Sequence, residues 1–99
     1  MAELTVISWR DIPSQVTATD GARTARRQLD ERFMRAIDAA AVLAGLVEAD
    51  AYLEEWRRET RPCGDDVEAE VVAEAARLEA QLDRAALIQL TRAGGLREP

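Results

Sequence analysis

The feature that most constrains the fold is the segment Leu4–Pro13, a short apolar run that closes with tryptophan, arginine, aspartate, isoleucine and proline. The β-branched and aromatic residues of Leu4–Trp9 favour a strand, and Pro13 should turn it because proline has no amide proton for a neighbouring strand. A strand that ends in a tryptophan and two opposite charges needs a specific packing or binding reason. Whether Trp9 is core or contact surface stays open at this point.

A β-hairpin is expected directly after this strand. Asp20-Gly21 is the dipeptide preferred in two-residue type I′ turns, and it would join Gln15–Thr19 to Ala22–Arg26. One face of this hairpin is then apolar and can pack on helices: Val16, Ala18, Ala25 and Leu29. The other face is polar: Gln15, Thr17, Thr24, Arg26 and Gln28.

Helical regions follow the hairpin. The first opens at Asp30, a residue type favoured as an N-cap, and stops at Gly45, which is suited to the left-handed conformation after a helix. A second helix is expected from about Ala49 to Thr60. Residues 61–64, which include a proline and a glycine, form the expected joint after it.

The third helical region begins near residue 65 and extends to Ala93. At ~1.5 Å per residue an unbroken helix of this extent would be about 42 Å long, longer than a small globule needs. Asp83 is able to cap a new short helix, and Leu87 and Ile88 leave the apolar stripe of the preceding turns. An unbroken helix would project and favour a homo-oligomer through residues 66–93, whereas a break near Asp83 would return the chain to the core.

Together these patterns predict a single α+β domain over residues 1–99, β-rich over 4–29 and helical over 30–94. We expect a small antiparallel β-sheet of two or three N-terminal strands packed against three or four C-terminal helices. A chain of this length buries only roughly 60–65% of its unfolded surface, so a partner or second copy would add stability. The aromatic fraction is only 4%, which makes each of the four large rings important to the core.

The net charge of −6 argues against a general affinity for nucleic acid or for an anionic membrane. The charge is unevenly distributed, because residues 46–99 carry all of the acidic excess. Within Gly21–Arg35, by contrast, five arginines meet only Asp30 and Glu31. All cationic residues are arginine, for which codon bias is the plain explanation and bidentate recognition of anions the alternative.

Catalytic chemistry is poorly represented in the sequence. Without histidine there is no imidazole base, nucleophile relay or histidine metal ligand. Cys63, the single cysteine, excludes an internal disulfide and is interpreted as an incidental thiol. The carboxylates of the third helical region are interpreted as its solvated face: Glu68, Glu70, Glu74, Glu79 and Asp83. No catalytic residue, metal or cofactor is expected.

A cytoplasmic protein that does not enter the membrane is expected, because the chain shows no signal region and no long apolar run. The candidate binding residues are Trp9, Arg10, Asp11, Arg26, Arg27 and Arg32. The first three either organise the turn or form a recognition edge, since tryptophan and arginine are frequent in binding hot spots. The remaining arginines are either solvated or contact an acidic protein surface or a phosphorylated ligand. Nucleic acid is disfavoured, because Phe33 is the one aromatic neighbour.

Parts of the sequence resemble a known family. The residues that carry the resemblance are Ile7–Val16, Asp20-Gly21, Ala25–Leu29, Arg32-Phe33, Ala36–Ala39, Ala44-Gly45 and Asp50–Arg57. They are similar to the small bacterial domain family called virulence factor, a domain also found in conserved virulence factor C-type proteins. The similarity covers about Leu4–Arg58, and residues 60–99 match less distinctively.

The resemblance implies at most an accessory role. Larger relatives join the domain to a segment similar to the N-terminal domain of iron-sulfur scaffold proteins and to helical repeats. Stand-alone versions look similar to proteins encoded near folate and corrinoid methyl-transfer enzymes. We therefore expect a non-enzymatic accessory or protein-binding module that serves a one-carbon, corrinoid or other cofactor-dependent enzyme, with an enzyme subunit as partner. The alternative is a small-ligand or anion-binding domain that uses the arginine-rich patch.

Overall fold

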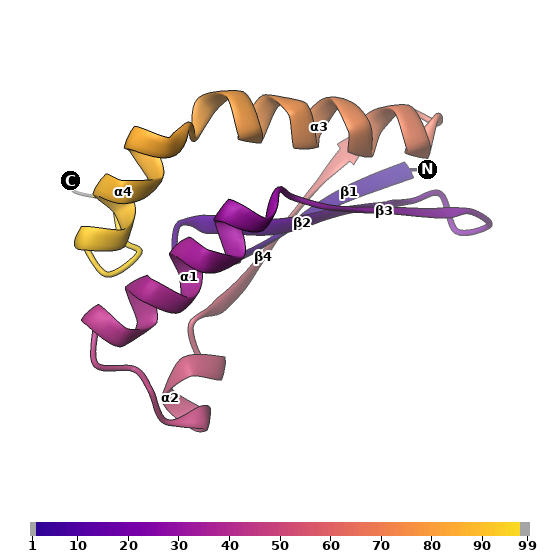
Figure 1. The fold of residues 1–99 in the computed structure, drawn as a ribbon. Helices are drawn as coiled ribbons and strands as arrows, with labels where there is room; N and C mark the ends of the chain where they lie inside the picture. Colours follow the sequence, from indigo (N-terminus) through magenta and orange to yellow (C-terminus); the bar gives the residue numbers. More distant parts are fainter. Residues whose placement is uncertain (1, 98–99) are drawn as a thin grey trace.

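Four strands form one antiparallel sheet in the order β3-β2-β1-β4 in the computed structural model, which describes residues 2–97 (Figure 1). The strands are β1 (Ala2–Trp9), β2 (Ile12–Thr19), β3 (Thr24–Gln28) and β4 (Trp56–Cys63). The first three follow one another as hairpins, whereas β4 returns from the helical part of the chain and pairs with β1. The α+β class is confirmed, and the sheet has four strands where two or three were expected.

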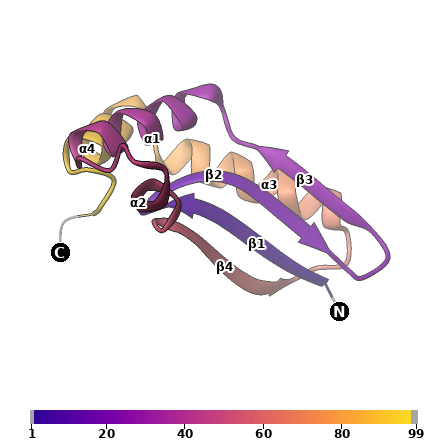
Figure 2. The same cartoon turned by 90° about the horizontal axis from the view of Figure 1, so that it is seen from below.

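Four helices accompany the sheet: α1 (Glu31–Leu43), α2 (Ala49–Leu53), α3 (Val67–Gln81) and α4 (Arg84–Arg92). α3 lies across one face of the sheet and packs mainly on β2 and β3, while α1 packs against α4 at one end (Figure 1). From below, the opposite face is open along most of its length, and only α2 lies at its end (Figure 2). Within residues 2–97, no helix has both the length and the apolar character needed to cross a bilayer.

The second helix expected over Ala49–Thr60 is wrong beyond Leu53. α2 ends there, and the chain continues as β4, which pairs Thr60 with Thr5 across the β1 edge. Residues 57–61 are arginine, glutamate and threonine, so they show no apolar alternation and consist mostly of good helix formers. Backbone pairing with β1 overrides this local preference, because strand formation depends strongly on tertiary context.

The loop between β2 and β3 is longer than the two-residue turn that Asp20-Gly21 predicts. Thr19 pairs with Thr24, so that residues 20–23 all lie in the loop. The Asp20 carboxylate accepts hydrogen bonds from the backbone amides of Ala22 and Arg23, at 2.9 and 2.7 Å. This Asx-type turn shifts the register by two residues, which leaves each side chain on the predicted face of the hairpin.

The third helical region breaks at Asp83, which is one of the two alternatives that the sequence left open. The Asp83 carboxylate accepts a hydrogen bond from the Ala86 amide at 2.9 Å and caps α4. α4 then packs against α1 and buries Leu87 and Leu90. The helix therefore returns to the core and does not project.

Trp9 lies in the core of the molecule. Its side chain is 0% exposed, its ring stacks on Tyr52 with centroids 5.7 Å apart, and its indole N–H donates to the Tyr52 carbonyl at 2.9 Å. Gly95 lies so close to the ring that an added Cβ would sit 2.9 Å from Trp9 Cζ3. The structural interpretation of Trp9 therefore holds, and its side chain is not available as a contact surface.

The close approach of Gly95 to Trp9 gives a test of the core. Gly95 and Gly21 both have positive φ, 90° and 94°, but a Cβ on Gly21 meets nothing within 4 Å. We expect Gly21→Ala to lower the free energy of unfolding by about 1–2 kcal/mol through backbone strain alone. Gly95→Ala should cost about 1–3 kcal/mol more, because it also overpacks the ring.

Urea unfolding followed by tryptophan fluorescence measures both variants against the unmodified protein. Equal costs at the two glycines would contradict the close packing of Gly95 on the Trp9 ring.

Candidate functional site

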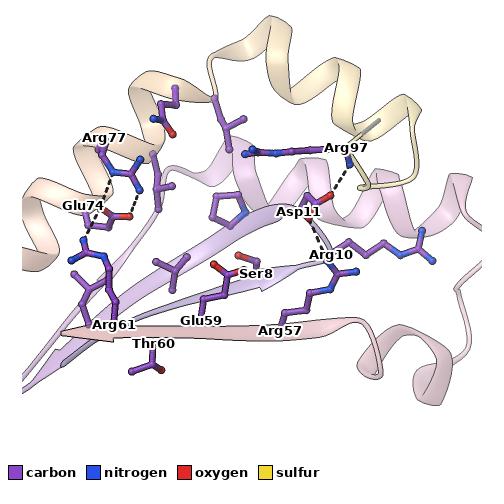
Figure 3. Close-up of a pocket in the computed structure, with 16 residues that line it drawn as sticks. Ser8, Arg10, Asp11, Arg57, Glu59, Thr60, Arg61, Glu74, Arg77 and Arg97 are labelled. Carbon is purple, nitrogen blue, oxygen red and sulfur yellow. Dashed lines mark hydrogen bonds and ion pairs between the residues drawn. The ribbon is translucent and has the colours of Figure 1, made fainter. Parts of the chain in front are cut away.

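A cleft of about 490 Å³ lies between α3 and the half of the sheet formed by β1 and β4 (Figure 3). It exists because α3 packs mainly on β2 and β3 and makes far fewer contacts with β1 and β4. Four arginines and three acidic residues supply its charges: Arg57, Arg61, Arg77, Arg97, Asp11, Glu59 and Glu74. The Arg10 guanidinium turns away toward Glu55. The cleft thus has an excess of positive charge, although the chain as a whole carries −6.

Three of these charged side chains come from alternate positions of β4. Successive side chains of a strand point to opposite faces, so Arg57, Glu59 and Arg61 share the cleft side of the sheet. Glu59 of β4 pairs with Val6 of β1, and Val6 pairs with Val16 of β2, which lies under α3. The side chains of Arg57, Glu59 and Arg61 therefore lie on the helix-covered face of the sheet. The floor of the cleft therefore alternates in charge along the strand: positive, negative, positive.

Glu74 is the buried charge of the cleft, with a side chain that is only 5% exposed. Arg77 donates to both of its carboxylate oxygens, with Nε 2.8 Å from Oε1, and Arg61 donates to Oε1 at 3.3 Å (Figure 3). Glu74 was expected on a solvated helix face, and this is wrong because β4 brings Arg61 beneath α3. The hydrogen bonds from Arg77 hold the pKa of Glu74 below its usual value, against the opposing effect of burial.

Asp11 organises the opposite end of the cleft. Its Oδ1 accepts from Arg57 at 3.3 Å, and its Oδ2 accepts from the Arg97 backbone amide at 2.6 Å. Its own amide donates to the Gly95 carbonyl at 2.8 Å. Figure 3 shows the Arg97 side chain extending from the C-terminal segment into the cleft. Asp11 therefore joins three parts of the chain that are distant in sequence.

Arg10 is held in place from several sides. It has a φ of 52°, which is unusual for a residue with a side chain. Its Nε donates to Glu55 Oε1 at 2.7 Å, and its Nη1 donates to the Gly94 carbonyl at 3.0 Å. The guanidinium also lies over the Trp9 ring, 5.3 Å from the centroid. Arg10 thus braces the turn after β1, and its side chain remains only 16% exposed.

The basic patch read from residues 21–35 does not form one surface. Arg26 pairs with Thr17 on the open face of the sheet, whereas Arg27 pairs with Val16 and belongs to the other face. Arg32 donates to the Glu79 carbonyl at 2.8 Å and so connects α1 to the end of α3. The arginines that do converge come mainly from residues 57–97, the acidic part of the sequence. Sequence reasoning missed them because the strand that carries two of them was predicted as helix.

Cys63 ends β4 and is partly buried. Burial, followed by the negative charge of Glu70, raises the pKa of its thiol. A thiol with a raised pKa stays protonated near neutral pH and is a weak nucleophile. Within residues 2–97, no group of three Cys, Asp or Glu side chains is placed to hold a metal ion.

The fold and the cleft together define a small α+β domain that presents an arginine-lined cleft at one half of an antiparallel sheet. The chain belongs to the family described as Virulence factor, whose model matches residues 7–91. The match includes α3 and almost all of α4, so it continues well past Arg58, after which the sequence resemblance is less distinctive. No curated protein and no solved structure matches the chain.

The environment of Glu74 predicts a pH dependence of stability. Because its pKa in the folded protein lies below the usual value near 4.5, its contribution is complete above that pH and is lost as the pH falls through the lower folded pKa. We expect Glu74→Gln to lower the free energy of unfolding at neutral pH by about 1–3 kcal/mol. The difference from the unmodified protein should shrink as the solution is acidified.

Urea unfolding over a pH series measures this difference. Glu68→Gln is the matched control, because Glu68 lies exposed on the same helix. A loss for Glu74→Gln that is independent of pH, or equal to that of the control, would contradict the assignment.

Proposed function

We propose that this chain is a non-enzymatic protein-binding module and that an acidic segment of its partner docks on the arginines of the cleft. The observation that carries the proposal is the gathering of four arginine side chains against three acidic residues in one cleft of a chain with a net charge of −6. Such a local reversal of sign attracts an anionic segment, while the net charge of −6 opposes close approach of other copies of the chain.

The ion pairs within the cleft leave its arginines with unused donor capacity. Arg61 and Arg77 share the single carboxylate of Glu74, and Arg57 has one contact at 3.3 Å with Asp11. A guanidinium carries five N–H donors, so each of these groups can donate hydrogen bonds to further carboxylates. Arg57 and Arg61 are about half exposed, which keeps them accessible to a partner. Bidentate contacts with carboxylates are the recognition mode that this geometry favours.

Binding fits the chemistry of the cleft better than catalysis does. Glu74 is the buried carboxylate there, and its lowered pKa keeps it ionised near neutral pH. An ionised carboxylate that is already held by two arginines is a poor general acid, and its lone pairs are occupied as acceptors. Of the remaining acids of the cleft, Asp11 is fixed in hydrogen bonds to Arg57 and Arg97, and Glu59 is exposed to solvent.

The partner that we propose is a subunit of an enzyme. The expected service to a one-carbon, corrinoid or other cofactor-dependent enzyme follows from the family resemblance alone and belongs to this proposal. The geometry supports one property of such a partner, which is an exposed acidic segment able to reach the cleft between α3 and β4.

A small anionic ligand is the second candidate. The volume of the cleft, about 490 Å³, lies within the range of small-molecule sites, about 300–1,000 Å³. A ligand that binds only the folded chain raises its melting temperature. A thermal-shift screen with folate, cobalamin and phosphate compounds therefore separates this candidate from a module that binds only proteins.

Replacing the two exposed arginines of the cleft floor tests the main proposal. We expect the double variant Arg57→Gln, Arg61→Gln to capture its partner from native lysate at least about tenfold less, because each charged hydrogen bond contributes about 1.5–3 kcal/mol. Affinity capture with quantitative mass spectrometry measures the effect. Arg35→Gln, Arg84→Gln is the matched control, since both arginines are exposed on helices outside the cleft.

Circular dichroism should show that both double variants remain folded. Equal capture by the cleft variant and the control variant would contradict docking at the cleft.

A further inference from the structure

We infer that the partner segment binds as an extended strand added to the outer edge of β4, with acidic, basic and acidic side chains at alternate positions opposite Arg57, Glu59 and Arg61. The inference rests on the proposed function and specifies the conformation and the charge pattern of the acidic segment. Strand addition of this kind uses backbone hydrogen bonds for affinity and side chains for specificity.

The outer edge of β4 has no strand beside it. β4 is the last strand in the sheet order, and among residues 2–97 no other strand pairs with that edge. Figure 2 shows β4 as the outermost element on its side. At 8 residues β4 is also longer than β3, the opposite edge strand, which has 5. A strand edge of this length presents unpaired amide and carbonyl groups that form a template for another chain.

The side chains of β4 define which strand fits. A strand added at about 4.8 Å would place its side chains with Cβ atoms about 4.5–5.5 Å from those directly opposite. Arg57 and Arg61 then each favour a carboxylate, and Glu59 between them favours a lysine or an arginine. Because the order positive, negative, positive reads the same from both ends, the complementary pattern is the same for a parallel and an antiparallel strand.

The alternate positions of β4 distinguish a parallel from an antiparallel added strand. Arg58 and Thr60 point to the open face of the sheet, where Thr60 Oγ1 lies 2.9 Å from Thr5 Oγ1. An acid opposite Arg58 and a threonine opposite Thr60 complete the match, and their order along the peptide differs between the two directions. Pro62 has no amide proton, so the pairing is confined to the part of β4 before it.

Charge also selects against other edge strands. Residues 57–61 carry three arginines and one glutamate. An apolar strand would leave these charges without partners, and a basic strand would be repelled. An acidic segment with a single central base is therefore the occupant that the edge fits, rather than a general aggregating strand.

Peptide titrations test the inference with the intact chain. The probe is a short polythreonine peptide whose second, fourth and sixth residues are glutamate, lysine and glutamate. We expect its addition to shift the amide NMR signals of β4 first. A peptide with the two charges exchanged, lysine at the ends and glutamate in the centre, should bind at least about tenfold more weakly, because three favourable pairs of up to about 1 kcal/mol become repulsive.

N-methylated peptides test the strand itself. In an extended peptide alternate amides point toward β4 and away from it. We therefore expect N-methylation of one alternating set of amides to abolish binding and N-methylation of the other set to leave it unchanged. No docking mode that relies on side chains alone predicts this difference.

Three results would overturn the inference while the proposed function stands. The first is equal binding of both N-methylated peptides. The second is no binding of the probe peptide, while partner capture from lysate still requires Arg57 and Arg61. The third is pairing of β4 with a second copy, which would appear as a dimer in sedimentation that Glu59→Arg alters. A different result would contradict the proposed function itself: capture of the partner from lysate that does not require Arg57 and Arg61.

Discussion

The burial of Trp9 is the interaction on which the rest of the structure depends. Its ring lies between Tyr52 of α2 and Gly95 of the C-terminal segment, so one side chain joins the end of β1 to parts of the chain far away in sequence. In a chain with 4% aromatic residues, few other side chains bury comparable area. The contact with Tyr52 also positions the start of β4, because α2 leads directly into that strand.

The turn after β1 transmits this packing to the cleft. Arg10 adopts a positive φ, and its guanidinium is held by Glu55 and by the Gly94 carbonyl. That conformation directs the next residue, Asp11, toward Arg57 and the C-terminal segment. The least generic part of the sequence thus acts mainly as a structural junction, and only its aspartate faces the charged groups of the candidate site.

Local signals made part of this fold predictable from sequence. Asp30 and Asp83 both act as N-caps as their residue type suggests, and the two faces of the hairpin have the expected character despite the shifted register. The fourth strand could not be predicted in this way. Its residues favour a helix locally, and its partner β1 lies about fifty residues earlier in the chain, so only tertiary pairing reveals it. The cleft was unpredictable for the same reason, because its floor is β4.

The incomplete cover of the sheet links the fold to the proposed binding. A two-layer domain normally buries one whole face of its sheet, yet here α3 packs mainly on β2 and β3 and leaves β4 to charged side chains. Glu74 shows how the molecule tolerates this, since its buried charge is stable only between Arg61 below and Arg77 beside it. The same arginines that satisfy Glu74 keep the cleft positive in an acidic protein. A strand that continued the sheet past β4 would extend this positive floor, so structural compensation and recognition would use the same residues.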